Sequence, residues 1–445
     1  MQMHFFPDRF RGVRRRRMKG LVWLAGAYLV LLGAVALLAD HLASPLPYRC
    51  IYRGEVLYPH MQPDRRDTFW DTSESHYRLM FYREVNWTHQ EITSARWAPV
   101  PYDVQPLNGD HPMPPDTLVV PPGLPAHVPA HERRFAHRLG TTRLGLDLLA
   151  GLLHGTRVTL GSGLLATACL ALLGIALGLA SGYWGDTRLH LPRGSLVVWG
   201  LLLLPAWYYS IDRRSMLLEL GTPAWTWLGT TLLWLAVWGM LAYVLGRLAQ
   251  RSAWGAHPVP LALDTLISKL IEVLDAMPAL LVVLAVMPIF ENRSVWLLAL
   301  VVGMTSWTGI ARLLRAECIR VREADYVLAA QALGLPGWRI ILRHVLPNAI
   351  GPVLVALASA LGSAMLIESA FSFLQVVEES NSWGSLMRGA YEHEDAWWLV
   401  VYPGLALMLT VLSVNILGEH LRDRLDRQGG DRPPDKKIQP LAKVF

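Results

Sequence analysis

The chain has 445 residues, of which 53% are hydrophobic and 17% are charged, and its formal net charge is +6. A soluble protein usually carries about 25% charged residues, so this composition excludes an ordinary soluble domain. Apolar runs of bilayer length recur along the chain, since about 20 residues span the hydrocarbon core. We therefore predict an all-α polytopic membrane protein. No basic patch interleaved with aromatic residues indicates a nucleic-acid partner.

Residues 1–20 form a basic tail with four successive arginines, and the first apolar run occupies residues 21–39. A cleaved signal peptide is the alternative, but its apolar core spans only about 7–15 residues. We expect an uncleaved transmembrane anchor whose arginines hold the N-terminus in the cytoplasm.

Residues 40–138 form a polar insert rich in proline, histidine, tryptophan and tyrosine. The stretches YRCIYRGEVLYP and SHYRLMFYREV alternate enough to predict strands, whereas PMPPDTLVVPPGLPAHVP can sustain neither a helix nor a central strand. Long loops cross the membrane largely regardless of their charge. The insert is therefore predicted to be a small, β-containing extracytoplasmic domain.

Three histidines, His127, His131 and His137, raise the question of a metal site in this insert. The sequence HERRF lacks the second histidine of a zinc-binding HExxH motif, and Pro129 interrupts the helical spacing between His127 and His131. A solvated loop without a metal ion is the favoured interpretation.

Seven further apolar runs make eight crossings with the first, so both chain termini should lie on one side of the membrane. The chain after residue 417, including the tail 428–445, and the loop after residue 313 are both basic, which favours the cytoplasm for each. The seven runs are residues 160–183, 195–209, 225–245, 270–290, 295–313, 350–373 and 399–417.

Motifs for covalent chemistry are missing from the sequence, which has no GxxxxGK[ST] phosphate-binding loop and no GxSxG nucleophile elbow. We therefore expect a transport subunit without an ATPase site of its own. Asp275 and Glu272 lie near the start of the fifth run, where a structural cap is favoured. Glu368, with its neighbour Ser369, lies towards the outer end of the seventh run and is a candidate for a polar translocation path.

A polar, alanine-rich segment separates the sixth and seventh runs. Residues 324–333 are predicted to form a short helix, in which Ala329 and Ala330 are small enough to let another surface approach closely. Gly334 can adopt the positive φ that ends a helix.

The chain then turns and enters a second, amphipathic helix at residues 338–345, which Pro347 is expected to end. Two short helices joined at a glycine and facing the cytoplasm predict a docking element. An ordinary surface loop is the alternative.

The pattern AAQALG, followed by a basic and apolar step into Leu346-Pro347, resembles the cytoplasmic coupling motif of ABC-importer permeases. The stretches HRLGTTRLGLDLLAGLLHGTRVTL, IESAFSFL and YPGLALMLTVLSVNILGEHLRDRLD are similar to the C-type subunit of the dipeptide/oligopeptide permease family. YRGEVLYP and RWAP in the insert resemble the microcin C/peptide uptake branch of that family.

This resemblance implies an ABC permease core at residues 139–427, with an extra helix pair at about 195–247 where the family has only a short link. It implies a bacterial inner-membrane location, a second permease subunit, two ATPase subunits that bind ATP in place of any cofactor here, and an extracytoplasmic substrate-binding protein. The ATPase-coupling residues would be Glu323, Asp325, Leu328, Ala329, Ala330, Gly334, Arg343, His344, Leu346 and Pro347.

The sequence departs from the family pattern at three positions. Leu328 replaces the usual glutamate of the coupling motif, so Glu323 or Asp325 would have to supply its charge. Thr142 and Leu146 stand where the family commonly has aspartate and arginine.

The substrate is left open between peptides, nickel and other small solutes. An ion-gradient-driven secondary transporter and a membrane-embedded enzyme are the alternative functions, and both would require polar groups inside the spans.

Overall fold

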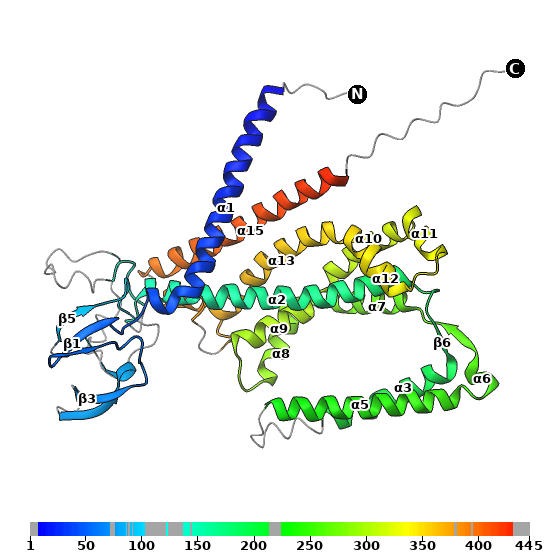
Figure 1. The fold of residues 1–445 in the computed structure, drawn as a ribbon, viewed down its shortest axis with the longest axis horizontal. Coiled ribbons are helices and arrows are strands. Elements are labelled where there is room, and N and C mark those ends of the chain that lie inside the picture. Colours follow the sequence, from blue (N-terminus) through cyan, green and yellow to red (C-terminus); the bar gives the residue numbers. More distant parts are fainter. Residues whose placement is uncertain are drawn as a thin grey trace. The chain divides into compact units, whose positions relative to one another are not determined.

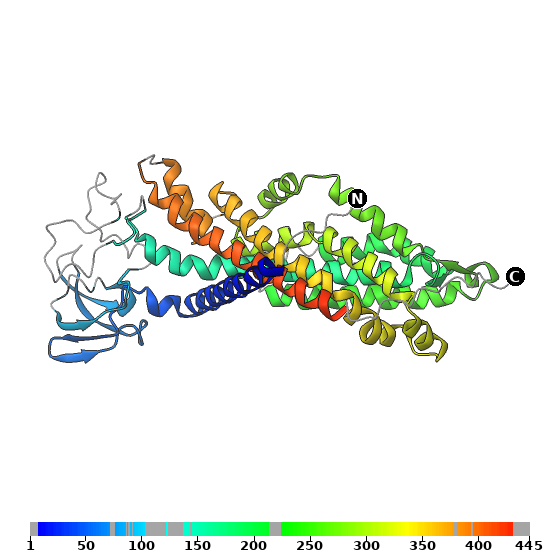
Figure 2. The same ribbon diagram turned by 90° about the horizontal axis from the view of Figure 1, so that it is seen from above.

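The computed structural model describes residues 8–71, 76–85, 87, 90, 92–102, 122, 137–142, 145–212, 224–377, 381–392 and 395–429. The chain is mostly helical (Figures 1 and 2). It forms two compact units. The first comprises Met1–Ile175, Asp275–Leu314 and Pro347–Phe445, and the second comprises Ala176–Leu274 and Arg315–Leu346.

Among the described residues, six helices are long and apolar enough to cross a membrane, and one bent helix pair would make a seventh. The predicted run at 195–209 corresponds to α3 (Arg193–Trp207), whose 15 residues alone are shorter than a span needs. The π-helical turn η4 (Tyr208–Asp212) continues it. The polytopic all-α class is therefore confirmed, while the number of eight crossings stays a prediction.

The first unit contains long helices packed through small residues. At Gly303 in α9, an added Cβ atom would lie 2.7 Å from the Ala166 carbonyl oxygen and 2.6 Å from the Cys169 Cβ atom in α2. Small residues allow such close approach between transmembrane helices. The elements of this unit include α1 (Asp8–Leu42), most of α2 (Leu148–Trp184), α8 (Ala279–Val286), η5 (Met287–Ile289), α9 (Val295–Thr305), the start of α10 (Thr308–Arg322), α13 (Leu346–Phe373), α14 (Trp383–Glu392) and α15 (Trp398–Gly429).

The described part of the insert forms strands, as both alternating stretches predict. β1 (Arg49–Tyr52) lies between β2 (Glu55–Leu57) and β5 (Ile92–Arg96), and β3 (Arg66–Asp71) pairs with β4 (His76–Phe81). A core of aromatic rings fills the domain, with the Phe69 ring centroid 5.1 Å from that of Trp87 and 5.7 Å from that of Tyr82 in η1 (Tyr82–Glu84). Most of the proline-rich stretch lies outside the described residues.

The chain enters α2 through a compact turn centred on Asp147. This carboxylate accepts a hydrogen bond from the Ala150 amide at 2.8 Å and lies 3.0 Å from His137. The His137 ring stacks on Tyr102 at 4.4 Å. His137 therefore has a structural role here, while His127 and His131 lie outside the described residues. Thr142 is one of the residues that depart from the family pattern. Its hydroxyl closes the turn by accepting a hydrogen bond from the Leu146 amide at 3.2 Å.

The second unit contains the predicted extra helix pair. α3 and α5 (Ala224–Ala249) lie side by side (Figure 1), and the Gln250 side chain donates to the Ser195 hydroxyl at 2.7 Å. Leu204 and Met240 are 74% and 66% exposed, as expected for helices that face lipid. The pair is followed by α6 (Ala253–Ala256), and β6 (His190–Pro192) pairs with β7 (Pro258–Pro260) at its base.

The predicted run at 270–290 is not one helix, which corrects the sequence prediction. α7 (Leu263–Asp275) and α8 are bent by 81° at the break between them. The break precedes Pro278, where the residue before a proline is steered away from helical backbone and the proline itself cannot donate a hydrogen bond. Asp275 pairs with Arg312 at 3.0 Å and Glu272 with Lys269 at 2.7 Å, so both carboxylates have structural partners.

Pro347 does not end the second helix of the loop, which is a further correction. α12 (Gly337–Ile340) continues through the π-helical turn η6 (Ile341–Val345) into α13 without a break. A π-helical turn widens the backbone locally. It thereby accommodates a proline that cannot donate the regular helical hydrogen bond.

The packing at Gly303 yields a test of the fold. Gly303→Val should lower the free energy of unfolding by about 1–3 kcal/mol, because the added atoms overpack the contact with Ala166 and Cys169. Gly309→Val is the matched control, since nothing lies within 4 Å of its Cβ position. Thermal unfolding of the detergent-solubilised protein measures both, and equal melting temperatures would contradict the close contact.

Candidate functional site

The segment between α10 and α13 is folded, and its first helix is α11 (Asp325–Ala332). Val327 and Ala330 are 0% and 5% exposed and face the interior of the second unit. Leu328 and Ala329 lie on the opposite, exposed face. The Ala330 side chain is therefore packed in this conformation, and Ala329 is the exposed small residue beside it. A docking contact at Ala330 stays a prediction.

Gly334 ends α11 in the way that the sequence predicts. Its φ is +73°, and the Leu335 and Gly334 amides donate to the carbonyl oxygens of Ala330 and Gln331 at 3.3 and 2.9 Å. This double hydrogen bond is the Schellman arrangement, which requires a left-handed residue. No atom lies within 4 Å of an added Cβ atom, so backbone conformation and not crowding demands glycine here.

Large apolar side chains are exposed along the loop. Leu328, Leu333 and Trp338 are 47%, 81% and 59% exposed. We define the docking surface as Leu328, Ala329, Leu333, Gly334 and Trp338. Apolar side chains gathered in a polar connecting loop are typical of a surface that another protein covers. The sequence analysis did not predict Leu333 and Trp338 as part of this surface. Both could have been found, because they are large apolar residues in a loop outside the apolar runs.

Charged residues surround this surface. Glu323 and Asp325 are exposed, and neither forms an ion pair with another described residue. Arg343 and Pro347 are also exposed, whereas His344 and Leu346 are half-buried. The Arg339 guanidinium lies over the Trp338 ring, 5.4 Å from its centroid.

An ion pair beneath the loop joins three helices of the second unit. The Arg315 Nη2 atom of α10 lies 2.6 Å from the Asp264 carboxylate of α7. The hydroxyl of Ser181 in α2 donates to the same carboxylate at 2.5 Å. Sequence reasoning did not find this group, because its members are far apart in the chain and no local pattern links them.

The C-terminal end of α2 lies close to the loop at two places, its start and its middle. The Arg322 guanidinium donates to the Gly182 carbonyl oxygen at 3.0 Å. An added Cβ atom at Gly337 would lie 3.5 Å from the Tyr183 ring. The helix end thus supports the loop where α10 ends and where α12 begins.

Asp186, just beyond α2, fixes the start of α7. It accepts the Thr265 amide and hydroxyl at 2.9 and 2.7 Å. The hydrogen bond from the Thr265 side chain holds the pKa of the Asp186 carboxyl below its ordinary value. The carboxylate form therefore persists as the helix cap to lower pH than an unpaired aspartate would allow.

Glu368 and Ser369 lie in α13 of the first unit, apart from the loop in sequence, and each is 2% exposed. The Ser372 hydroxyl donates to Glu368 at 2.7 Å, and that of Ser369 lies 3.3 Å from it. The carboxylate is enclosed by serines and does not line an open cavity in this conformation. Its place on a translocation path stays a prediction.

A family model described as "binding-protein-dependent transport system inner membrane component" matches residues 258–428. The match begins at the first residue of β7, which follows the helix pair and α6, and it includes the whole docking surface.

Curated relatives have similar descriptions. A putative peptide transport system permease protein of Brucella suis is 33% identical over 212 residues, which cover 46% of this chain and 67% of the relative. The oligopeptide transport system permease protein OppC of Haemophilus influenzae is 33% identical over 37% of this chain and 53% of its own length. The dipeptide transport system permease protein DppC of Alkalihalophilus pseudofirmus is 32% identical over 37% of this chain and 55% of its own length. The chain therefore belongs to the dipeptide and oligopeptide permease family of binding-protein-dependent ABC transporters, a family of multi-pass inner-membrane proteins.

Proposed function

We propose that this chain is the transmembrane subunit of an ATP-driven importer of peptides or peptide-like solutes, and that its docking surface binds an ATPase subunit. One observation carries the proposal: the loop between α10 and α13 is folded, ends its first helix on a left-handed glycine and exposes large apolar side chains. A plain connection would need none of these features. The named activities of the relatives support peptides as the substrate class.

The chain performs no covalent chemistry in this proposal. ATP binding brings the partner ATPases together and moves the docked loop. Arg322 and the Asp264–Arg315 ion pair transmit this movement to α2, α7 and α10, because they join the loop base to those helices. The spans then exchange inward-facing and outward-facing arrangements. The ATPases drive the exchange only by binding its two conformations with different affinities.

The assembly follows from the same proposal. A second permease subunit completes the pathway, two ATPases bind in the cytoplasm, and a substrate-binding protein delivers the solute from outside. Both chain termini and the docking surface are then cytoplasmic, and residues 40–138 lie on the extracytoplasmic side. The basic N-terminal tail supports this orientation.

The docking surface can be tested at Leu333, its most exposed large side chain. Leu333→Asp should weaken ATPase binding about tenfold or more, because burying a leucine contributes about 1.5–3 kcal/mol. Leu333→Met is the matched control and should bind normally. Binding of the purified ATPase to the permease in nanodiscs measures the effect. Unchanged binding and ATP-dependent uptake in Leu333→Asp would show that the loop is only a connection.

Asp325 is expected to supply the charge that Leu328 lacks. Asp325→Asn should weaken ATPase binding, and adding Leu328→Glu should restore it, since the new carboxylate lies one turn along the same exposed face. If Asp325 only stabilises the first turn of α11, Leu328→Glu should not restore ATPase binding, because residue 328 lies beyond that turn. Titration at low and high salt distinguishes the two, because only an ion pair across the interface weakens with salt.

The ion pair beneath the loop should matter for transport more than for docking. Asp264→Asn leaves Arg315 without its counter-charge and should lower substrate uptake while ATPase binding persists. Thr265→Val, which removes one of the two hydrogen bonds to Asp186, is a neighbouring control and should affect uptake less. Loss of ATPase binding and uptake in equal proportion would contradict the transmission role of Asp264.

A further inference from the structure

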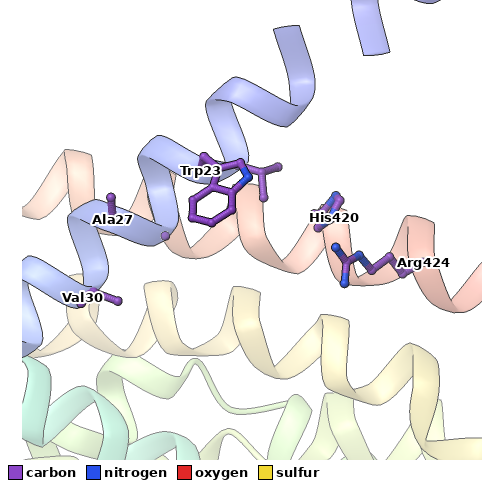
Figure 3. Close-up of a pocket in the computed structure, with 7 residues that line it drawn as sticks. Trp23, Ala27, Val30, His420 and Arg424 are labelled. Carbon is purple, nitrogen blue, oxygen red and sulfur yellow. The ribbon is translucent and has the colours of Figure 1, made fainter. Parts of the chain in front are cut away.

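The N-terminal anchor packs against the last core helix along only part of its length. The Tyr28 hydroxyl donates to the Ala406 carbonyl oxygen at 3.2 Å, and Leu32 is buried in a cluster that includes Leu407. Towards the N-terminal end of α1, the two helices diverge (Figures 1 and 3). A groove of about 750 Å³ occupies this space.

The two walls of the groove differ in chemistry. The α1 wall is apolar and consists of Val22, Trp23, Gly26, Ala27 and Val30. Trp23 and Val30 are 80% and 74% exposed, so the wall is open to its surroundings. Figure 3 shows the Trp23 indole of α1 on the side of that helix that faces α15, and it shows His420 and Arg424 on α15.

The α15 wall is basic, since it consists of His420 and Arg424. The two residues are four positions apart and therefore lie on one face of the helix. Arg424 is exposed and forms no ion pair with another described residue. It is the last residue of the candidate span Trp398–Arg424 and follows the apolar run that ends at residue 417. It therefore lies at the depth where a span meets lipid headgroups.

Further positive charge adjoins the groove in the sequence of α1. Arg9, Arg11, the four arginines at 14–17 and Lys19 precede the groove residues on the same helix. A cationic segment next to a span attracts anionic lipid, with about 1 kcal/mol for each basic residue near the surface. The groove itself therefore offers an apolar wall and a basic wall, and the sequence that precedes it on α1 is rich in basic residues.

We propose that the groove binds an anionic phospholipid, whose acyl chains cover the apolar α1 wall and whose phosphate lies at His420 and Arg424. Free phosphate would leave the apolar wall uncovered. A packed apolar helix that brings no carboxylate would remove the Arg424 charge from water without a counter-charge, which is costly. A zwitterionic lipid would gain little from the basic residues. The bound lipid would hold the diverging ends of α1 and α15 together, independently of ATPase docking.

The test uses the full-length protein in detergent, with any subunits that co-purify. Native mass spectrometry follows titration with dioleoylphosphatidylglycerol, and dioleoylphosphatidylcholine is the neutral probe. Phosphatidylglycerol should bind more tightly than phosphatidylcholine, and Arg424→Gln should weaken its binding about fivefold. Arg422→Gln removes the same charge from the same helix outside the groove and should have a smaller effect. Inorganic phosphate should not displace the lipid.

A second pair of variants tests the apolar wall without changing charge. Gly26→Phe fills the groove, whereas Gly33→Phe adds the same side chain to α1 outside it, and neither Cβ position has an atom within 4 Å. Only Gly26→Phe should weaken phosphatidylglycerol binding.

The proposal would be overturned by equal affinities for the two lipids, by equal affinities of Arg424→Gln and Arg422→Gln, or by displacement of the lipid by inorganic phosphate. Loss of a second permease subunit from Gly26→Phe, with unchanged lipid affinity, would instead make the groove a subunit interface and also overturn it.

Discussion

The ion pair between Asp264 and Arg315 is the interaction on which the second unit depends. The Arg315 and Asp264 side chains are 35% and 19% exposed, so both charges are partly removed from water and each needs its partner. The Ser181 hydroxyl donates to the same carboxylate, so one aspartate fixes the positions of α2, α7 and α10. The loop that follows α10 is therefore attached to a firm base. In the function proposed above, the docking surface needs such a base if movement of the loop is to reach the spans.

Local features of the fold could be predicted well from the sequence. Apolar runs identified the long helices because length and hydropathy suffice for that inference. The alternating stretches around Cys50 and Leu79 predicted β1, β2 and β4, since a strand with one buried face has a period of two residues. The glycine at 334 was predictable because a left-handed helix end demands that residue.

Features that depend on contacts between distant segments could not be predicted in this way. The sequence does not tell which alanine of AAQALG faces inwards, because that depends on where α11 packs, and Ala330 is the buried one. The continuation of the helix through Pro347 depends on the widened turn before it. The Asp264–Arg315 pair joins residues 51 positions apart, and no periodicity relates them. The same limit explains why the groove between α1 and α15 was not expected.

The short strands β6 and β7 give the extra helix pair an unusual relation to the family core. His190 lies opposite Pro260, so the chain leaves and re-enters the core at points about 5 Å apart, the spacing of paired strands. For the segments on either side, the whole insertion has the geometry of a tight turn. Its length could therefore vary without separating the two ends, which the strand pairing holds together. The helix pair thus adds membrane-facing surface while the segments that follow α2 and precede α7 stay next to each other.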